Sequence, residues 1–308
     1  MRIVVAGTPD VAVPTLNAIA ESEHEVVAVL TRPDAPLGRK RVLTPSPTAA
    51  RADELGLRVI KSARPGTAEV DQLAALGPDL GVVVAYGAIL DTAMLDVPKH
   101  GWINLHFSLL PKLRGAAPLQ RAIMAGGPTT GISIFQLEEG LDTGPVYLQR
   151  EHAIPSEATS GELLRELAER STGDVLDVVN SFAAGTAVAT PQSGEVTHAP
   201  KLTAADAPID WNREARLVHA HIRAVTPEPG AVTRVDGARL KIHRVKRANE
   251  VGELRLKPGE VTEHERRVFV GCADEPIEVI EVQPAGKKSM PADAWWRGMN
   301  ASDRVVLA

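Results

Sequence analysis

An amide, an imidazole and a carboxylate lie in the sequence where a fold could bring them together. Asn104 and His106 belong to the stretch Asn-Leu-His-Phe-Ser-Leu-Leu-Pro, which ends at Pro111, and Asp142 follows 31 residues later within Gly-Leu-Asp-Thr-Gly. An amide can stabilise an oxyanion, and an imidazole next to a carboxylate can move a proton. We interpret Asn104, His106 and Asp142 as candidate catalytic groups for passing an acyl group between two nitrogens.

The local pattern explains how these side chains could be positioned. Residues 103–107 are typical of a buried strand, and alternation along a strand puts Asn104, His106 and Ser108 on one face. Polar side chains within an apolar strand cost free energy unless they are paired, which favours a functional site. The glycines on both sides of Asp142 would let that loop come close to a ligand.

Each residue also has a simpler structural interpretation. His106 could be a hydrogen-bonded core residue, Asn104 could cap a turn, and Asp142 could be a turn residue beside glycines. The three are a poor set for zinc, so we expect no metal site. A Ser-His-Asp triad is also disfavoured, because Ser108 is only two residues from His106 on the same face and the sequence has no Gly-x-Ser-x-Gly elbow.

The surrounding elements predict an α/β fold with a Rossmann-like, mostly parallel sheet. Apolar strand-like runs alternate with helical patterns, and a helix is expected over 11–20. The expected strands are 2–6, 25–30, 80–85 and 103–107. Ligands of such sheets bind at the carboxyl ends of the strands. Nicotinamide dinucleotide binding is disfavoured, because Gly-Thr-Pro-Asp after the first strand lacks the second and third glycines of the phosphate-binding turn.

The chain is expected to contain a catalytic domain over 1–184, a linker over 185–209 and a C-terminal domain over 210–308. The first of these should close with an edge strand over 146–154 and one long helix over 159–183. The second should open with a helix over 213–224. Five short strands with turn signals then predict a small β-barrel, at 231–234, 240–245, 259–262, 267–271 and 277–283.

Composition restricts the class of protein. The chain has 308 residues and a net charge of −5, and this acidic balance argues against a general nucleic-acid binder. Cys272 is the only cysteine, which excludes an internal disulfide. The first residues are too short an apolar stretch for a signal peptide, and no apolar run reaches about 18 residues, so no membrane span is expected.

Two basic runs stand out from this acidic background. Residues 32–48 are rich in proline and are expected to form a long loop, which carries Arg39, Lys40 and Arg41. Three adjacent cations on such a loop could contact nucleic-acid phosphates. Considered alone, these residues favour the simpler interpretation of a solvated loop with ordinary basic side chains. The second run, residues 239–247, is expected to be a solvated strand face or an electrostatic contact for nucleic acid.

Taken together, the motifs resemble the folate-dependent formyltransferases over almost the whole chain. They include Asn-x-His at 104–106, Ser-Leu-Leu-Pro at 108–111, Arg-Gly-Ala-Ala-Pro at 114–118 and Gly-Leu-Asp-Thr-Gly at 140–144. The opening residues 2–9, Leu-Thr-Pro-Ser-Pro at 43–47 and the entry to the second domain resemble the branch of the family that acts on aminoacylated tRNA. The resemblance implies a Rossmann-like domain joined to a barrel similar to the oligonucleotide-binding (OB) fold.

The resemblance also implies a reaction, in which 10-formyltetrahydrofolate gives its formyl group to the amino group of methionyl initiator tRNA. Asn104, His106 and Asp142 match the family's catalytic residues. Asn104 and a protonated His106 would stabilise the oxyanion. Asp142, acting directly or through a water, would keep His106 charged and carry a proton from the attacking amine towards the leaving nitrogen.

By the same resemblance, folate would contact four consecutive residues, and tRNA would contact the basic loop. The folate contacts are Ser108, Leu109, Leu110 and Pro111, and the tRNA contacts are Arg39, Lys40 and Arg41. We expect a cytoplasmic monomer without a metal.

Three other functions have to be weighed. They are formylation of an amino sugar nucleotide, hydrolysis of formyltetrahydrofolate to formate, and nucleic-acid binding without catalysis.

Overall fold

A computed structural model of the chain describes residues 1–38, 40–248, 254–299 and 305–308. These residues divide into two compact units. Unit 1 contains 1–118, 130–152 and 164–199, and unit 2 contains 119–129, 153–163 and 200–308. Two short segments that precede residue 184 therefore cluster with unit 2. The three-part division at 184 and 209 stays a prediction.

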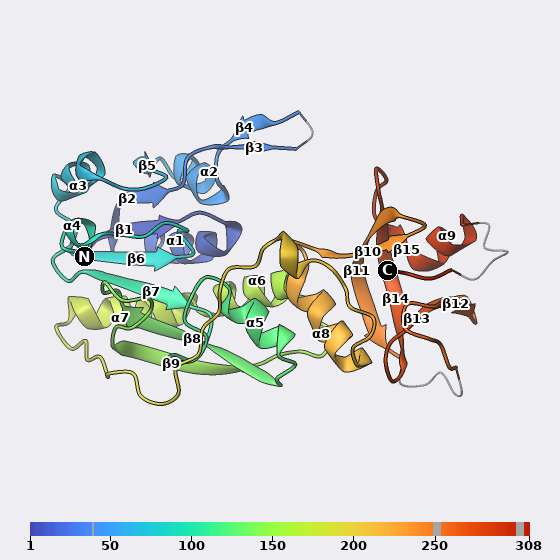
Figure 1. Cartoon of the computed structure of the whole chain (residues 1–308). Coiled ribbons are helices and arrows are strands. Elements are labelled where there is room, and N and C mark those ends of the chain that lie inside the picture. The colour runs from blue at the N-terminus through green and yellow to red at the C-terminus, as the bar shows by residue number, and fades with distance from the viewer. Residues whose placement is uncertain (39, 249–253, 300–304) are drawn as a thin grey trace. The chain divides into compact units, whose positions relative to one another are not determined.

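A mostly parallel sheet forms the centre of unit 1, with strand order β5-β2-β1-β6-β7-β8-β9 (Figure 1). Pairing is parallel from β5 to β7, and β8 runs antiparallel to β7. The strands are β1 Arg2–Gly7, β2 Glu25–Thr31, β5 Val59–Lys61, β6 Leu80–Val84, β7 Trp102–His106, β8 Thr129–Gln136 and β9 Val146–Ala153. The predicted strands and the edge position of β9 are confirmed. The sequence order of the strands reverses at β1, which lies between β2 and β6. Parallel sheets with such a reversal bind ligands at the carboxyl ends of their strands.

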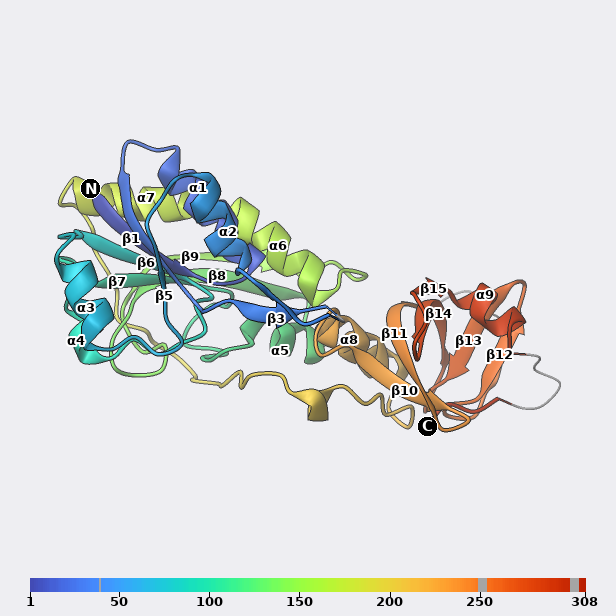
Figure 2. The same cartoon turned by 90° about the horizontal axis from the view of Figure 1, so that it is seen from above.

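Helices cover both faces of this sheet, with α1, α2 and α7 on one face and α3 and α4 on the other (Figure 2). The helices up to residue 183 are α1 Val13–Ala20, α2 Pro47–Glu54, α3 Thr67–Ala74, α4 Thr92–Leu95, α5 Pro118–Met124, α6 Ser160–Arg170 and α7 Thr172–Ala183. Leu73 of α3 and Met94 of α4 pack in a buried cluster with Val4 and Trp102. In the described part of the chain, no helix has both the length and the apolar character needed to cross a bilayer.

Two predicted helices differ from the structure. The segment 11–20 begins as a 3-10 turn over Asp10–Ala12, and the α-helix starts only at Val13. The single helix expected over 159–183 is wrong, because it is interrupted at Ser171. The Ser171 hydroxyl donates to the carbonyl of Leu167 at 2.6 Å, a local bond that competes with regular helix geometry.

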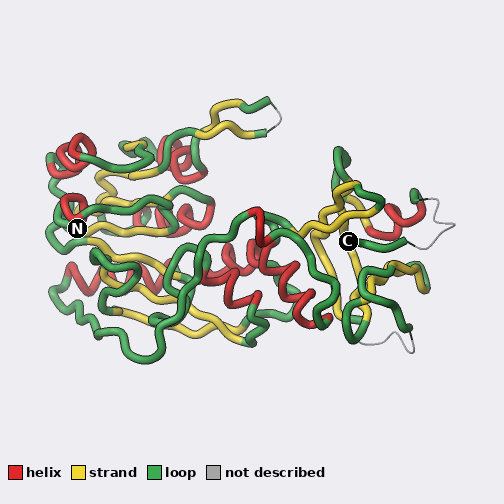
Figure 3. Tube along the Cα trace, in the orientation of Figure 1, coloured by secondary structure: helices red, strands yellow, loops and turns green. Residues whose placement is uncertain are grey.

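The long loop predicted over 32–48 is also partly wrong. Ala35–Leu37 (β3) and Val42–Thr44 (β4) pair as an antiparallel hairpin, which extends away from the main sheet of unit 1 (Figure 3). The hairpin turns at Gly38, which has a φ of 69°. Prolines are compatible with it because each strand has only one hydrogen-bonded neighbour.

Unit 2 is built around an antiparallel sheet with order β10-β11-β14-β13-β12, and β15 pairs with β14. Its elements are the 3-10 turn Ala204–Asp206, α8 Ala215–Val225, β10 Ala231–Val235, β11 Ala238–Arg247, β12 Val261–His264, β13 Arg267–Gly271, β14 Pro276–Pro284, β15 Met290–Pro291 and α9 Ala292–Arg297. The predicted helix and five strands are confirmed. Buried apolar side chains of α8, the strands and Trp295 share one core.

The last residues of the chain close this sheet. Ala308 exchanges two backbone hydrogen bonds with Arg234 of the edge strand β10. Val305 and Leu307 bond to Val261 and Gly259, at the opposite edge formed by β12. Both edges of the sheet are therefore paired, which is the barrel expected from the sequence.

Candidate active site

The carboxyl end of β7 presents two of the three candidate catalytic residues. Asn104 and His106 are two residues apart on the strand, so they share a face, while Leu105 is buried on the other. The His106 side chain is only 5% exposed, and its ring meets the ring of Phe135 edge to face at 6.1 Å. The Asn104 side chain is half-buried.

Asp142 comes from the loop between β8 and β9, and this loop brings it to His106. Its Oδ2 lies 3.8 Å from His106 Nδ1 and accepts a hydrogen bond from the Gly115 N–H at 2.7 Å. Asp142 has a φ of 51°, in the left-handed region that non-glycine residues rarely adopt. A side chain at Gly144 would collide with the carbonyl of Gln136, so only glycine fits there. The predicted pairing of His106 with Asp142 is thus present in the structure.

The hydrogen bonds of His106 fix which ring nitrogen can exchange a proton. Nε2 lies 3.0 Å from the carbonyl oxygen of Leu113, which can only accept, so Nε2 carries the hydrogen. Nδ1, which lies 3.8 Å from Asp142 Oδ2, is therefore the ring nitrogen that can accept a proton. Burial lowers the pKa of His106 below its usual value, although Asp142 and the Leu113 carbonyl act in the opposite direction. This direction favours a neutral imidazole, whereas the sequence led us to expect an imidazolium.

The predicted folate-binding residues form a tight turn after β7. The Ser108 hydroxyl donates to the carbonyl of Lys112 at 2.7 Å, so it is turned away from a triad with His106. The Ser133 hydroxyl accepts from the Leu110 N–H at 3.0 Å and donates to the Ser108 carbonyl at 2.7 Å. Leu110 is buried and Leu109 is half-buried. Several main-chain groups of this turn are thus used within the chain, and the folate contact stays a prediction.

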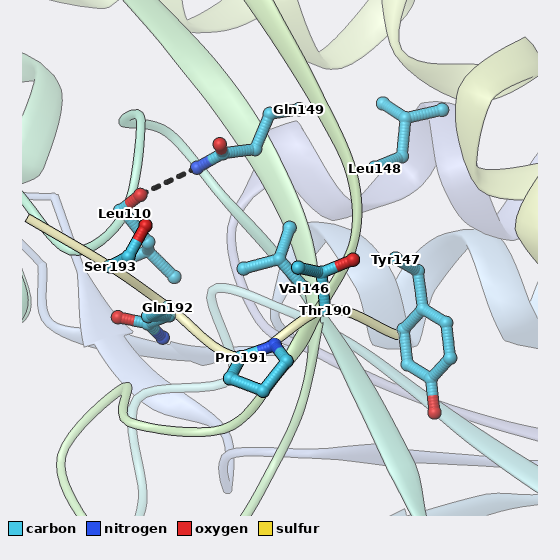
Figure 4. A pocket seen from close by; sticks show the side chains of 9 residues that line it. All are labelled: Leu110, Val146, Tyr147, Leu148, Gln149, Thr190, Pro191, Gln192 and Ser193. Atoms are coloured by element: carbon cyan, nitrogen blue, oxygen red, sulfur yellow. Dashed lines mark hydrogen bonds between the residues drawn. The ribbon is translucent and has the colours of Figure 1, made fainter. Parts of the chain in front are cut away.

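A pocket of about 270 Å³ lies beside this turn in unit 1 (Figure 4). The Gln149 side chain donates to the Leu110 carbonyl at 2.7 Å along one wall. Its lining consists of Leu110, Val146, Tyr147, Leu148, Gln149, Thr190, Pro191, Gln192 and Ser193. The pocket is therefore bordered by the turn after β7, the start of β9 and the segment 190–193.

Two of the predicted tRNA-binding residues, Lys40 and Arg41, lie between β3 and β4 at the tip of the hairpin. Lys40 and Arg41 are exposed there, and Arg39 lies outside the described residues. Leu37 and Leu43 beside them are each 68% exposed. The tip therefore presents cations and apolar side chains together, and its contact with tRNA stays a prediction.

Acidic, histidine and cysteine side chains do not gather at metal-ligand spacing anywhere in the described ranges. The side chains that the described site offers are an amide, an imidazole and a carboxylate.

Sequence reasoning missed the residues that hold the site together. Ser133 and Gln149 fix the turn after β7, and Gln192 and Thr197 contact the loops on either side of the His106–Asp142 pair. The last two lie in the stretch predicted to be a linker. No local pattern distinguishes these polar residues from ordinary loop residues, because each acts on a partner far away in the sequence.

Comparison with known proteins places these observations in a family. The family model described as "Formyl transferase" matches residues 1–179, and the model described as "Formyl transferase, C-terminal domain" matches residues 201–300. The chain is 52% identical to the methionyl-tRNA formyltransferase of Clavibacter sepedonicus over 306 residues, which cover 99% of this chain and 100% of that protein.

Solved structures with less similar sequences share the fold. The crystal structure of HypX from Aquifex aeolicus in complex with tetrahydrofolic acid has a TM-score of 0.69 at 21% identity, covering 96% of this chain and 46% of that one. Methionyl-tRNA formyltransferase from Clostridium thermocellum has a TM-score of 0.58 at 16% identity, covering 91% of this chain and 99% of that one.

Proposed function

The chain belongs to the formyl transferase family, and we propose that it transfers the formyl group of 10-formyltetrahydrofolate to the amino group of methionyl initiator tRNA. The observation that carries this function is identity of 52% over essentially the full length of a methionyl-tRNA formyltransferase. The His106–Asp142 pair at the end of β7 supplies groups that such a transfer needs.

The reaction requires one net proton movement. The amine nitrogen forms a bond to the formyl carbon, the bond from that carbon to N10 of the folate breaks, and one amine proton ends on N10. We propose that neutral His106 takes this proton on Nδ1, because Nε2 is already committed to the Leu113 carbonyl. The resulting imidazolium is stabilised by Asp142 at 3.8 Å and returns the proton to the leaving nitrogen.

The oxyanion formed on the formyl oxygen needs hydrogen-bond donors fixed in advance. The half-buried Asn104 amide can supply one of them, since it shares its strand face with His106. Once His106 has accepted the amine proton, its positive charge stabilises the oxyanion electrostatically. This sequence of events reconciles a neutral resting imidazole with the charge that the oxyanion requires.

The turn 108–111 is proposed to border the bound folate. It directly follows His106, and its internal hydrogen bonds through Ser133 and Gln149 give it a fixed shape before any ligand arrives. Leu109, the half-buried residue of the turn, offers apolar contact to a flat heterocycle. No metal enters this scheme.

The hairpin tip is proposed to contact the tRNA. Lys40 and Arg41 are exposed cations, and the neighbouring exposed leucines could pack against unpaired bases. Arg39 is included in this proposal on the basis of sequence alone. Because the acceptor serves translation initiation, we place the activity in the cytoplasm, and we propose that a monomer suffices, since the three catalytic residues come from one chain.

An acceptor comparison tests the function. The purified chain is incubated with 10-formyltetrahydrofolate and, in separate reactions, methionyl initiator tRNA, an amino sugar nucleotide or water alone. We expect fast transfer only to the charged tRNA. Faster transfer to the amino sugar nucleotide, or release of formate that the tRNA does not suppress, would assign the chain to another function.

A further inference from the structure

We propose that Gln192 and Thr197, in the stretch predicted to be a linker, are positioning residues that hold Asp142 and His106 in register for proton transfer. The proposal rests on the proposed catalytic roles of His106 and Asp142. It assigns a function to a segment that connects the matches to the two family models, at 1–179 and 201–300.

The Gln192 side chain holds the loop that carries Asp142. Its Nε2 donates to the backbone carbonyls of Asp142 and Gly144, both at 2.8 Å. Its Oε1 accepts from Arg114, at 2.7 Å from Nη2 and 3.2 Å from Nε. Every donor and acceptor role of this amide is therefore directed at the loops beside the site.

Thr197 acts on the other partner of the pair. Its Oγ1 accepts from the N–H of Leu113 at 2.8 Å, and the carbonyl of Leu113 accepts from His106 Nε2 at 3.0 Å. Thr197 therefore fixes the carbonyl that decides which nitrogen of His106 carries a hydrogen. One segment thus orients both the imidazole and the carboxylate.

Backbone conformation shows why both loops need such support. Asp142 has a φ of 51° and Leu113 has a φ of 61°, so each occupies the left-handed region without being glycine. Such conformations persist only where surrounding contacts impose them. At both positions a side chain from the segment 190–199 bonds directly to the backbone of the strained residue.

The segment itself is anchored on unit 1. Thr190 exchanges two backbone hydrogen bonds of 2.8 Å with Val146 at the start of β9, and Arg114 bonds to the backbone of Thr197 and Ala199. Backbone hydrogen bonds therefore hold the segment on both sides of Gln192 and at Thr197 itself. A residue that positions a catalytic group needs such support.

The test uses paired substitutions. Gln192→Met removes all the bonds of the amide, whereas Gln192→Glu keeps an acceptor for Arg114 but cannot donate to the two carbonyls. Thr197→Val removes the acceptor for Leu113, and Thr197→Ser restores it. Glu195→Gln changes an exposed side chain of the same segment and serves as the control.

Two measurements are made on each variant. Formylation kinetics with 10-formyltetrahydrofolate and methionyl initiator tRNA should show kcat lowered by about tenfold or more in both Gln192 variants and in Thr197→Val, since small misplacements of reacting groups are costly. KM and the thermal midpoint should change little, and Thr197→Ser and Glu195→Gln should keep the parent's kcat. Titration of His106, followed by NMR of its ring protons, should move to lower pH in Gln192→Met because Asp142 shifts away.

Parent-like kcat in Gln192→Met, or recovery of kcat in Gln192→Glu, would overturn the positioning role while leaving the proposed function intact. A parent chain that transfers no formyl group to tRNA would overturn the proposed function instead. The NMR titration would then still decide the positioning role, since an unmoved His106 titration in Gln192→Met contradicts it without reference to activity.

Discussion

Asp142→Asn removes the charge that faces His106 while it preserves the size of the side chain. The remaining amide oxygen can still accept from the Gly115 N–H, so the loop should keep its conformation. What is lost is the attraction between a carboxylate and the imidazolium that forms 3.8 Å away during the reaction. With an effective dielectric constant of about 20, two unit charges at about 4 Å attract by about 4 kcal/mol.

That loss corresponds to a kcat lowered by about a thousandfold, since each ~1.4 kcal/mol changes a rate by a factor of about ten. The assay is formylation of methionyl initiator tRNA at saturating concentrations of both substrates. Calorimetric titration with tetrahydrofolate should show unchanged binding, because the turn 108–111 is untouched. Glu139→Gln, an exposed position three residues earlier, removes the same charge and should leave kcat unchanged. A turnover within about tenfold of the parent's would refute the charge-pair reasoning.

Three further predictions concern pH, packing and charge. Because burial lowers the pKa of His106 and the neutral form accepts the proton, the part of the activity that depends on His106 should be lost as pH falls through a value below its usual pKa of ~6.5; an NMR titration of the His106 ring protons at or above that pH contradicts the assignment. Gly144→Ala should lower the free energy of unfolding by about 1–3 kcal/mol, whereas Gly173→Ala, which has open space, should not; equal melting curves would contradict the packing argument. Replacing Lys40 and Arg41 by alanine should raise KM for tRNA and flatten its salt dependence, and an unchanged salt slope argues against tRNA contact at the hairpin tip.

The sequence predicts most of the fold because local patterns dominate where strands are buried on both faces. The runs at β1, β2 and β6 are almost purely apolar, β7 is apolar except at Asn104 and His106, and each strand is confirmed within about two residues. The predicted helix over 159–183 is interrupted at Ser171, where the backbone still donates to Leu167 and accepts from Val175, so the apolar pattern gives no sign of the break. The hairpin at 35–44 was missed because prolines and exposed leucines are compatible with both a loop and an edge pair.

The site is predicted only in part, and for a physical reason. His106 and Asp142 could be predicted as candidates, because a polar side chain within an apolar strand and a carboxylate between glycines both indicate a site. The protonation state of His106 could not be predicted, since it depends on burial and on the Leu113 carbonyl. Gln192 could not be found either, because its significance lies in contacts with residues about 50 and 78 positions away.

The central claim is most directly tested by following a labelled formyl group through a single turnover. The purified chain is mixed with 10-formyltetrahydrofolate, labelled in the formyl carbon, and with methionyl initiator tRNA. The account predicts one labelled N-formylmethionyl-tRNA for each tetrahydrofolate released, with no free formate. Label recovered as formate, or tetrahydrofolate released without labelled tRNA, would contradict it.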